Sequence, residues 1–285
     1  MNREKMRKIE YKLRCVNLEY GFREVYVPIM NNYDIYQGSI LDKHLYRCVN
    51  GKEIEVLRAD YTTALVASFA KSDNKLPKRI AYYGEVFRKD KSKNYRQIGV
   101  EIFGGDEKET DFLITELVFE YIKTIDIKKG VFCINYLPLV NMMIEKLDLK
   151  NKEEKEFKKS LLEHNYVKIQ EILSNKLSKN EYDLIWKLFN EREILKALDI
   201  IKQVFPEYLM PKAVLELLAK FAKRLVFDIG LVKNLDYYTG LVFEVYVPKV
   251  ANPIISGGRY DDLSKRFDKS FPAIGFALDA NYLGE

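Results

Sequence analysis

One segment of the chain combines helical periodicity with a lack of glycine, and it constrains the fold more than any other feature. Across 138–222, apolar residues recur at the spacing of one helix face. Glycine is absent there, and Pro206 and Pro211 fall where the helical patterns break. Because strand patterns lie on both sides, we predict one α+β core, formed by 1–137 and 223–285, that is interrupted by a helical insertion over 138–222.

The elements before the insertion indicate a largely antiparallel sheet flanked by helices. Asn50-Gly51 is a good hairpin turn, and Pro28 places its strand at an edge or an interface. Thr62 or Thr63 can cap a helix. The predicted elements are a helix over 3–19 ended by Gly21, a strand over 24–29, a hairpin of 44–48 and 53–59, a helix from 62 or 63 to about 71, strands over 79–88 and 95–104, a helix over 108–124 and a strand over 131–136.

Composition excludes several classes of protein. Of the 285 residues, 47% are hydrophobic and 31% are charged, which suits a soluble protein with a full core. The 47 basic and 42 acidic residues leave a net charge of +5 without a long isolated basic run, so composition does not favour a nucleic-acid partner. No apolar run approaches the length of a membrane span, and no apolar signal core follows Met1, so we expect no membrane segment.

Cysteine and histidine usage argue against metal and triad chemistry. Cys15, Cys48 and Cys133 are far apart and odd in number, which predicts reduced thiols in a cytoplasmic protein. His44 and His164 are the only histidines, so a histidine-based metal site or triad is not expected. The sequence therefore predicts neither a metal nor a cofactor.

A strand pattern near the end of the chain is entered through an unusual polar cluster. Within 241–246, apolar residues alternate with Glu244 and Tyr246, which is the period of a strand with one buried face. Lys233, an Asp, two adjacent Tyr and Thr-Gly precede it. The simplest interpretation is a strand that follows a polar turn. Strand patterns resume near 224, and two further features, over 255–261 and 271–278, close the chain.

Other polar residues could line a pocket together with this cluster. Gln97, Gly99 and Glu101 share one face of their strand, while Asp60 and Arg88 follow strand ends. With Asp236, Tyr238 and Tyr260, they would suit a small cationic or zwitterionic ligand. The alternatives are a solvated sheet face, surface charge and, for Ser256-Gly257-Gly258-Arg259, a plain turn. The residues alone thus predict an α+β domain with a candidate polar pocket.

Taken in order, these segments resemble the catalytic core of histidyl-tRNA synthetase, a class II synthetase. The resemblance covers nearly the whole chain. Its segments are 20–28 (motif 1), Leu57-Arg58-Ala59-Asp60-Tyr61-Thr62, Phe87-Arg88 with 97–101 (motif 2), 235–244 and 257–261 (the two histidine-recognition motifs), and 272–277 (the start of motif 3).

Departures from the synthetase pattern point to a paralogous family. Tyr282 and Lys233 stand where synthetases carry arginines, and Asn234 replaces a glycine. The motif 2 loop is shorter, and the sequence stops at Glu285 without an anticodon-binding domain. Since a lysine cannot reproduce a bidentate guanidinium, nucleotide chemistry is not expected. This profile resembles the regulatory subunits of short-form ATP phosphoribosyltransferase, which often have Leu-Arg-Ala-Asp at the position of 57–60 and a segment similar to 228–232.

The resemblance implies a non-catalytic subunit with no catalytic residues of its own. It implies a short-form catalytic subunit as partner, in a hetero-oligomer expected to be a hetero-octamer, a self-dimer through the class II core, histidine feedback, and no tRNA. The residues that could contact an anion are Arg88, Lys233 and Arg259. The histidine-binding residues it implies are Asp60, Thr62, Gln97, Glu101, Tyr238 and Tyr260.

Two other hypotheses stay open. One is a truncated or degenerate histidyl-tRNA synthetase with residual histidine activation. The other is an aminoacyl transferase-like paralogue that acts on another acceptor, for which the sequence carries no signal. A further alternative is that histidine binds at the subunit interface rather than in the synthetase-like pocket.

Overall fold

A computed structural model describes residues 3–72, 75–90, 94–206, 212–233 and 238–284, and the chain divides into two units. The first unit comprises Met1–Lys128, Ile254–Ser256 and Asp261–Glu285. The second comprises Lys129–Pro253 and Gly257–Tyr260. Each unit has its own sheet strands and its own helices, and each is considered in turn.

The first unit is built on long antiparallel strands. β5 (Lys78–Phe87) and β6 (Asn94–Phe103) form a hairpin, and β11 (Ala273–Asp279) pairs antiparallel with β6 on its other side. The short β1 (Arg23–Glu24) pairs parallel with β5. The predicted strands over 79–88 and 95–104 are therefore confirmed to within one residue.

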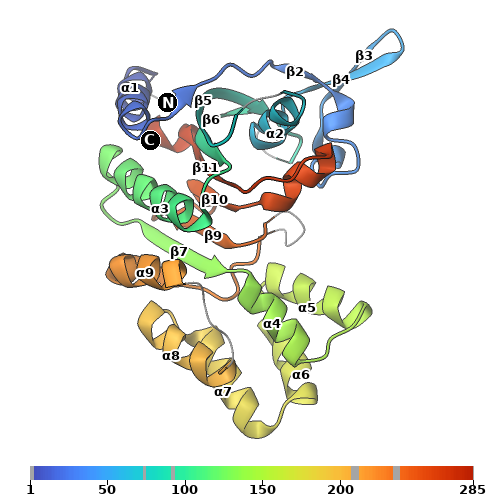
Figure 1. The fold of residues 1–285 in the computed structure, drawn as a ribbon, viewed down its shortest axis with the longest axis vertical. Helices are drawn as coiled ribbons and strands as arrows, with labels where there is room; N and C mark the ends of the chain where they lie inside the picture. The colour runs from blue at the N-terminus through green and yellow to red at the C-terminus, as the bar shows by residue number, and fades with distance from the viewer. Residues whose placement is uncertain (1–2, 73–74, 91–93, 207–211, 234–237, 285) are drawn as a thin grey trace. The chain divides into compact units, whose positions relative to one another are not determined.

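Helices cover this part of the sheet. α3 (Glu107–Thr124) contacts β11, and α1 (Arg3–Glu19) contacts α3 (Figure 1). The Asp106 side chain caps α3 by accepting hydrogen bonds from the backbone amides of Lys108 and Glu109. Both helices match their predictions, and Gly21, with a φ of +77°, follows the end of α1 as expected for a left-handed C-cap.

A smaller sheet in the first unit confirms the predicted hairpin turn, but the first strand covers 47–50 instead of 44–48 because a 3-10 helix occupies Asp42–His44. β3 (Arg47–Asn50) and β4 (Glu53–Leu57) pair antiparallel around Gly51, and β2 (Met30–Asn32) lies on the other side of β4. The helix that follows, α2 (Thr62–Ala70), begins without a side-chain cap from Thr62 or Thr63. The capping prediction is wrong because Asp60 takes that role, accepting from the Thr63 amide at 3.3 Å.

The predicted strand over 24–29 is also wrong. β1 ends at Glu24 and β2 begins at Met30. Between them, the carbonyls of Val27 and Pro28 accept hydrogen bonds from the buried guanidinium of Arg58, which also donates to the Glu85 carbonyl. A charged side chain from β4's end thus replaces the ladder that a continuous strand would need.

The second unit combines a short sheet with helices. β7 (Val131–Tyr136) pairs antiparallel with β9 (Leu241–Tyr246) and parallel with β8 (Leu225–Phe227). β10 (Ile255–Arg259) contributes its first two residues to the first unit and its last three to the second. The predicted strands over 131–136 and near 224, and the alternating strand before Tyr246, are confirmed.

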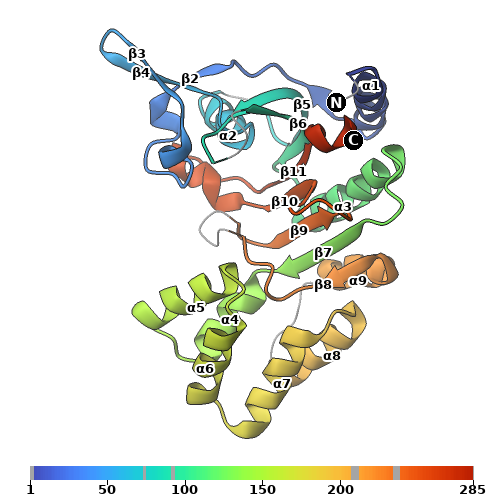
Figure 2. The same ribbon diagram turned by 180° about the vertical axis from the view of Figure 1, so that it is seen from behind.

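The helical periodicity over 138–222 is confirmed as a series of helices (Figure 2). α5 contacts α6, and α7 contacts α8 and α6. A capping box starts α7, in which Ser178 and Glu181 exchange hydrogen bonds. The bounds are α4 (Pro138–Lys146), α5 (Lys152–Leu162), α6 (Tyr166–Lys176), α7 (Lys179–Asn190), α8 (Ile194–Val204) and α9 (Lys212–Phe221).

The predicted division of the chain into a core and an insertion over 138–222 stays a prediction. Within the described part of the chain, no helix has the length and apolar character that crossing a membrane requires. Short 3-10 helices complete the structure at Tyr33–Ile35, Asp42–His44, Ala222–Arg224, Asp261–Phe267 and Ala280–Gly284.

Candidate functional site

Glycines open one face of the first unit's sheet to polar side chains. In the register of β5, β6 and β11, Gly99 lies opposite Tyr82, and Gly275 lies opposite Glu101. A Cβ atom at Gly275 would overlap the Glu101 carboxylate, and one at Gly99 would overlap the Tyr82 hydroxyl. These glycines therefore allow Tyr82 and Glu101 to lie flat across the neighbouring strands. We call this surface the glycine-floored face.

Glu101 places a buried carboxylate on the glycine-floored face. Its side chain is buried, and its Oε1 accepts hydrogen bonds from the Thr62 hydroxyl at 2.6 Å and the Tyr82 hydroxyl at 3.4 Å. Burial and the nearby Glu101 charge raise the pKa of Tyr82 well above its usual value, so this hydroxyl remains a donor. The structure thus brings the predicted residues Thr62 and Glu101 into direct contact.

Asp60 has a second, structural role beside its predicted one. Its carboxylate accepts hydrogen bonds from the Thr63 hydroxyl at 2.8 Å and from the Thr63 amide, while the Asp60 carbonyl accepts from Tyr36. Burial raises the pKa of the Asp60 carboxyl, and the hydrogen bonds from Thr63 oppose this shift. A ligand cation near Asp60 would offset the cost of its buried charge.

Gln97 lies on the same face of the sheet as Glu101. In the register of β6, it stands opposite Gly84 on β5 and Asp279 on β11. Its side-chain amide donates to the Tyr95 hydroxyl at 3.2 Å, which orients the amide. The predicted shared face of Gln97, Gly99 and Glu101 is confirmed by this pairing.

Arg88 has a carboxylate partner within its own loop. Its Nε donates to Asp90 at 2.9 Å, and a second nitrogen contacts the other Asp90 oxygen in a bidentate pair. His44 lies 4.0 Å from the same carboxylate. The pairing with Arg88 holds the pKa of Asp90 below its usual value, although burial acts in the opposite direction. The Arg88 charge is thus largely compensated without an external anion.

In the second unit, Lys233 is similarly compensated. Its ammonium lies 3.2 Å from Glu244 and 5.4 Å from the centre of the Tyr238 ring, and its side chain is 12% exposed. Burial lowers the pKa of Lys233, and Glu244 opposes that shift. The Tyr246 hydroxyl donates to the other Glu244 oxygen. The Lys233 charge is therefore directed towards a carboxylate and an aromatic face.

The two tyrosines predicted to bind histidine contact one another in the second unit. The rings of Tyr238 and Tyr260 are 6.5 Å apart and meet edge to face at 79°. Gly258, with a φ of +154°, lets the Tyr238 ring approach, since an added Cβ would lie 3.0 Å from a ring carbon. Arg259 is buried and packs its methylenes over Gly240, which leaves little of it available to a surface anion. Asp236 and Asn234 lie outside the described residues.

Several neighbours of these residues were missed by the sequence analysis. Tyr82 could have been found from strand parity. It is separated from Gly84 and from Arg88 by an even number of residues, so all three positions share one face of the predicted strand. The ion-pair partners Asp90 and Glu244 could not be found from the sequence. A charged residue in a loop or on a strand face has the same local sequence pattern whether or not it forms an ion pair. Tyr282, the other departure from the synthetase pattern, is half-buried in the last 3-10 helix.

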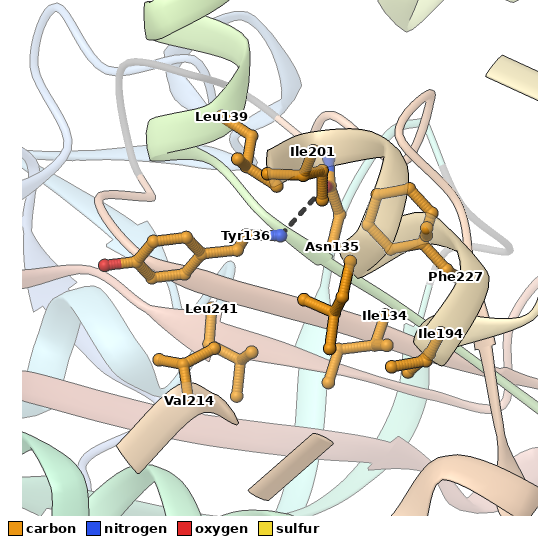
Figure 3. Close-up of a pocket in the computed structure, with 11 residues that line it drawn as sticks. Ile134, Asn135, Tyr136, Leu139, Ile194, Ile201, Val214, Phe227 and Leu241 are labelled. Atoms are coloured by element: carbon orange, nitrogen blue, oxygen red, sulfur yellow. Dashed lines mark hydrogen bonds between the residues drawn. The ribbon is translucent and has the colours of Figure 1, made fainter. Parts of the chain in front are cut away.

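A narrow apolar cavity lies in the second unit beneath the end of β7 (Figure 3). Its free space of about 10 Å³ holds at most one water-sized sphere. Ile134, Ile201 and Leu241 are among the side chains around it, and Asn135 lies at its wall. It is too small for a metabolite. Over the described ranges, no group of three or more His, Cys, Asp or Glu side chains is arranged to hold a metal ion.

Comparison with known proteins gives a consistent result. The family model described as histidyl-tRNA synthetase matches residues 1–283. A relative from Thermoanaerobacter pseudethanolicus, named ATP phosphoribosyltransferase regulatory subunit, is 29% identical over 95% of this chain and 76% of its own. These findings confirm the resemblance to the synthetase and to its regulatory paralogues.

Solved structures show the same fold. A protein from Bacillus halodurans C, described as an ATP phosphoribosyltransferase regulatory subunit/histidyl-tRNA synthetase, has a TM-score of 0.87 and 24% identity, covering 99% of this chain and 78% of its own. Histidyl-tRNA synthetase from Nostoc sp. PCC 7120 has a TM-score of 0.83 and 19% identity, covering 98% and 70%. The predicted class II synthetase-like α+β fold is confirmed.

Proposed function

Because the chain belongs to the histidyl-tRNA synthetase family, we propose that it keeps that family's histidine site but serves as a non-catalytic regulatory subunit. In this role it supports the catalytic subunit of a short-form ATP phosphoribosyltransferase and conveys histidine feedback in the first step of histidine biosynthesis. The name of its relative from Thermoanaerobacter pseudethanolicus supports this role.

One observation carries the proposal. Arg88 and Lys233, the cations available for a nucleotide, each pair with a carboxylate of their own unit, Asp90 and Glu244. Displacing a carboxylate would cost an anionic ligand much of the energy it gains, so productive ATP binding is disfavoured. Glu101 and Asp60, by contrast, present negative charge to a cationic group, which suits an amino-acid ligand better than a nucleotide.

Each unit, taken by itself, carries groups that are chemically complementary to histidine. In the first unit, the carboxylates of Asp60 and Glu101, with Thr62 and Gln97, offer acceptors for the ligand's ammonium and imidazole N–H groups. In the second unit, Tyr238 and Tyr260 offer aromatic surface and hydroxyls. The two groups are tested by separate variants, since either could fail alone.

Histidine would act by linkage. If it binds one conformation of the assembly more tightly than another, it shifts the partner's equilibrium towards the less active form. We further propose a cytoplasmic hetero-oligomer, in which this chain also dimerises with itself and binds no tRNA; a hetero-octamer is the stoichiometry implied by the resemblance.

Calorimetry with free histidine tests the ligand. We expect binding by the protein, alone or with its catalytic partner, and at least a tenfold loss in Glu101→Gln because a charge-assisted hydrogen bond is removed. Glu120→Gln, which changes a partly exposed glutamate on α3, is the matched control and should bind normally. Tyr238→Phe should weaken binding, and Tyr182→Phe on α7 should not. Absence of binding by the wild type in both settings would remove the sensor role.

A second candidate is a degenerate synthetase that still activates histidine. The family match and the retained Arg88 favour it. Histidine-dependent exchange of pyrophosphate into ATP separates the two functions. A robust exchange rate would show that Arg88 or Lys233 releases its carboxylate for a nucleotide, and it would overturn the non-catalytic assignment.

A further inference from the structure

The segment that leads into the predicted histidine-recognition motif is held unusually firmly in the second unit. We call residues 228–233 the lead-in segment, because Lys233 at its end lies over the Tyr238 ring. Its apolar side chains are deeply buried, with Ile229 1% and Val232 4% exposed. The segment has no regular ladder, so its backbone groups need partners from elsewhere.

β7 supplies one set of partners. The side-chain amide nitrogen of Asn135 donates to the carbonyls of Ile229 at 3.1 Å and Leu231 at 3.2 Å. The amide oxygen accepts from the Tyr136 backbone at 2.8 Å, the bond drawn in Figure 3. Since Asn135 is 1% exposed, this clamp is shielded from water.

The helical region supplies the other set. Arg192, in the turn between α7 and α8, accepts a hydrogen bond from the Phe227 amide through its carbonyl at 2.9 Å. Its guanidinium lies 2.7 Å from the Asp228 carboxylate, which in turn accepts from the Gly230 amide at 3.0 Å. Tyr166, at the start of α6, lies so close to Gly230 that an added Cβ would be 3.2 Å from its hydroxyl.

These contacts form a continuous physical connection from the α7–α8 turn to a predicted ligand contact. Arg192 fixes Asp228, Asp228 fixes the turn at Gly230, and the lead-in segment ends at Lys233, which contacts Tyr238. A shift of the α7–α8 turn would break an ion pair and a backbone hydrogen bond at once. A connected set of ion pairs and hydrogen bonds of this kind can couple the conformation of a helical region to the geometry of a binding site on another element.

We propose that Arg192 is a positioning residue for Lys233 and Tyr238, so that the helical region of the second unit sets the affinity for histidine. The proposal rests on the proposed function, because it concerns the same ligand. It gives the helices from α6 to α8 a role in regulation, since a partner that displaces the α7–α8 turn would change the affinity for histidine. By linkage, bound histidine would change the affinity for that partner by the same factor.

Three variants test this role. Arg192→Ala removes the ion pair, and Arg192→Lys keeps the positive charge without the planar guanidinium. The control, Lys146→Ala, breaks an ion pair between α4 and Glu181 of α7 that does not involve the lead-in segment. Histidine affinity is measured by calorimetry, and amide hydrogen exchange over 229–232 is measured without ligand. We expect Arg192→Ala to raise the Kd at least fivefold and to speed exchange at Gly230 and Leu231 at least tenfold. Arg192→Lys should lie between it and the wild type, and Lys146→Ala should match the wild type within twofold.

The outcomes separate the two proposals. Unchanged exchange in Arg192→Ala overturns the positioning role, and faster exchange with an unchanged Kd overturns the link to histidine affinity. A wild type that binds no histidine overturns the proposed function and with it the affinity claim, while the exchange measurement still decides whether Arg192 positions the segment. If Arg192→Ala does not fold, Asp228→Asn serves instead, because it keeps an acceptor for Gly230 and loses only the charge pair.

Discussion

The glycine-floored face of the first unit and the lead-in segment of the second hold their polar groups in different ways. Glu101 and Tyr82 project from neighbouring strands, and their places are set by where glycines leave room. Lys233 and Tyr238 stand outside any strand, and side chains from β7 and the α7–α8 turn fix the chain before them. The first arrangement is rigid because its scaffold is a sheet. The second depends on a few contacts that a partner could alter.

The difference suggests how binding and regulation could be separated in one molecule. A buried carboxylate on strands offers a fixed contact that is costly to move, since its hydrogen bonds would be left unpaired. A loop held from helices can change with those helices. Substitutions in each region test this contrast.

Among the substitutions in the glycine-floored face, Gly275→Ala should destabilise the folded protein most. The added methyl group would overlap the Glu101 carboxylate and the Val100 carbonyl. Moving the carbonyl would disturb the β6–β11 pairing, and moving the carboxylate would break its hydrogen bonds to the Thr62 and Tyr82 hydroxyls. We expect a loss of about 3 kcal/mol in the free energy of unfolding, measured by urea denaturation.

Ala277→Gly provides the control for this substitution. It removes a Cβ from the same face of the same strand and should cost only about 0.5 to 1 kcal/mol. If Gly275→Ala were no more destabilising than the control, the close approach of Glu101 would not be what requires glycine there.

The lead-in segment should be loosened by Asn135→Leu. The substitution preserves bulk but leaves the carbonyls of Ile229 and Leu231 without their buried donor. We expect a loss of about 2 kcal/mol in urea denaturation, together with weaker histidine binding. Asn190→Leu changes an exposed asparagine at the end of α7 and should leave both quantities nearly unchanged.

Asp60→Asn should act on stability with a defined pH dependence. Burial raises the pKa of Asp60, so the folded state holds its proton above pH 3.8, where the unfolded chain has released it. The protonated carboxyl therefore favours folding at low pH, and this contribution is lost as pH rises through the folded-state pKa. At pH 7 the asparagine variant, which lacks the buried charge, should be more stable by about 1 kcal/mol, and the gain should vanish as the pH approaches 3.8.

Asp90→Asn should change the free energy of unfolding at pH 7 in the opposite direction. Its pKa is held low by Arg88, so its ionised form stabilises the fold above pH 3.8, and that contribution is lost on acidification below this value. The asparagine variant should therefore be less stable than wild type at pH 7. Urea denaturation measures the two trends, at pH 7 and pH 4 for Asp60→Asn and at pH 7 and below pH 3.8 for Asp90→Asn. Equal signs of the two stability changes at pH 7 would contradict the assigned environments.

The smallest effect is expected for Ser178→Ala at the start of α7. It removes the capping box, whose hydrogen bonds, together with Lys146, lower the pKa of Glu181 to about 2. We expect a loss of about 0.5 to 1 kcal/mol by urea denaturation and no change in histidine binding, because α7 keeps its packing. A change in binding would mean that the whole helix, rather than the Arg192 tie, controls the lead-in segment.

Much of the fold could be predicted because its signals are local. Periodicity located the helices over 3–19 and 108–124 and the paired strands of β5 and β6 to within one residue. The strand predicted over 24–29 failed because Arg58, distant in sequence, takes the carbonyls of Val27 and Pro28. A propensity-based prediction has no knowledge of such a partner.

The candidate site was predictable in part for the same reason. Strand parity placed Gln97, Gly99 and Glu101 on one face. The resemblance to a family added Thr62 and Tyr238 to the histidine site, and their role there stays a prediction. No local pattern indicated that Asp90 would compensate Arg88, or that Glu244 would compensate Lys233. Those pairings bear directly on whether a nucleotide can bind.

Local signals in the sequence were enough to predict most of the helices and strands and the hairpin turn at Gly51, because backbone periodicity and turn chemistry act over a few residues. Which charges are compensated, and what holds the lead-in segment, depends on contacts between residues that are distant in the chain. Arg192 and Asp228 are far apart in the chain, and their contact depends on how α7, α8 and β8 pack, so the energy of that ion pair is a property of the folded unit.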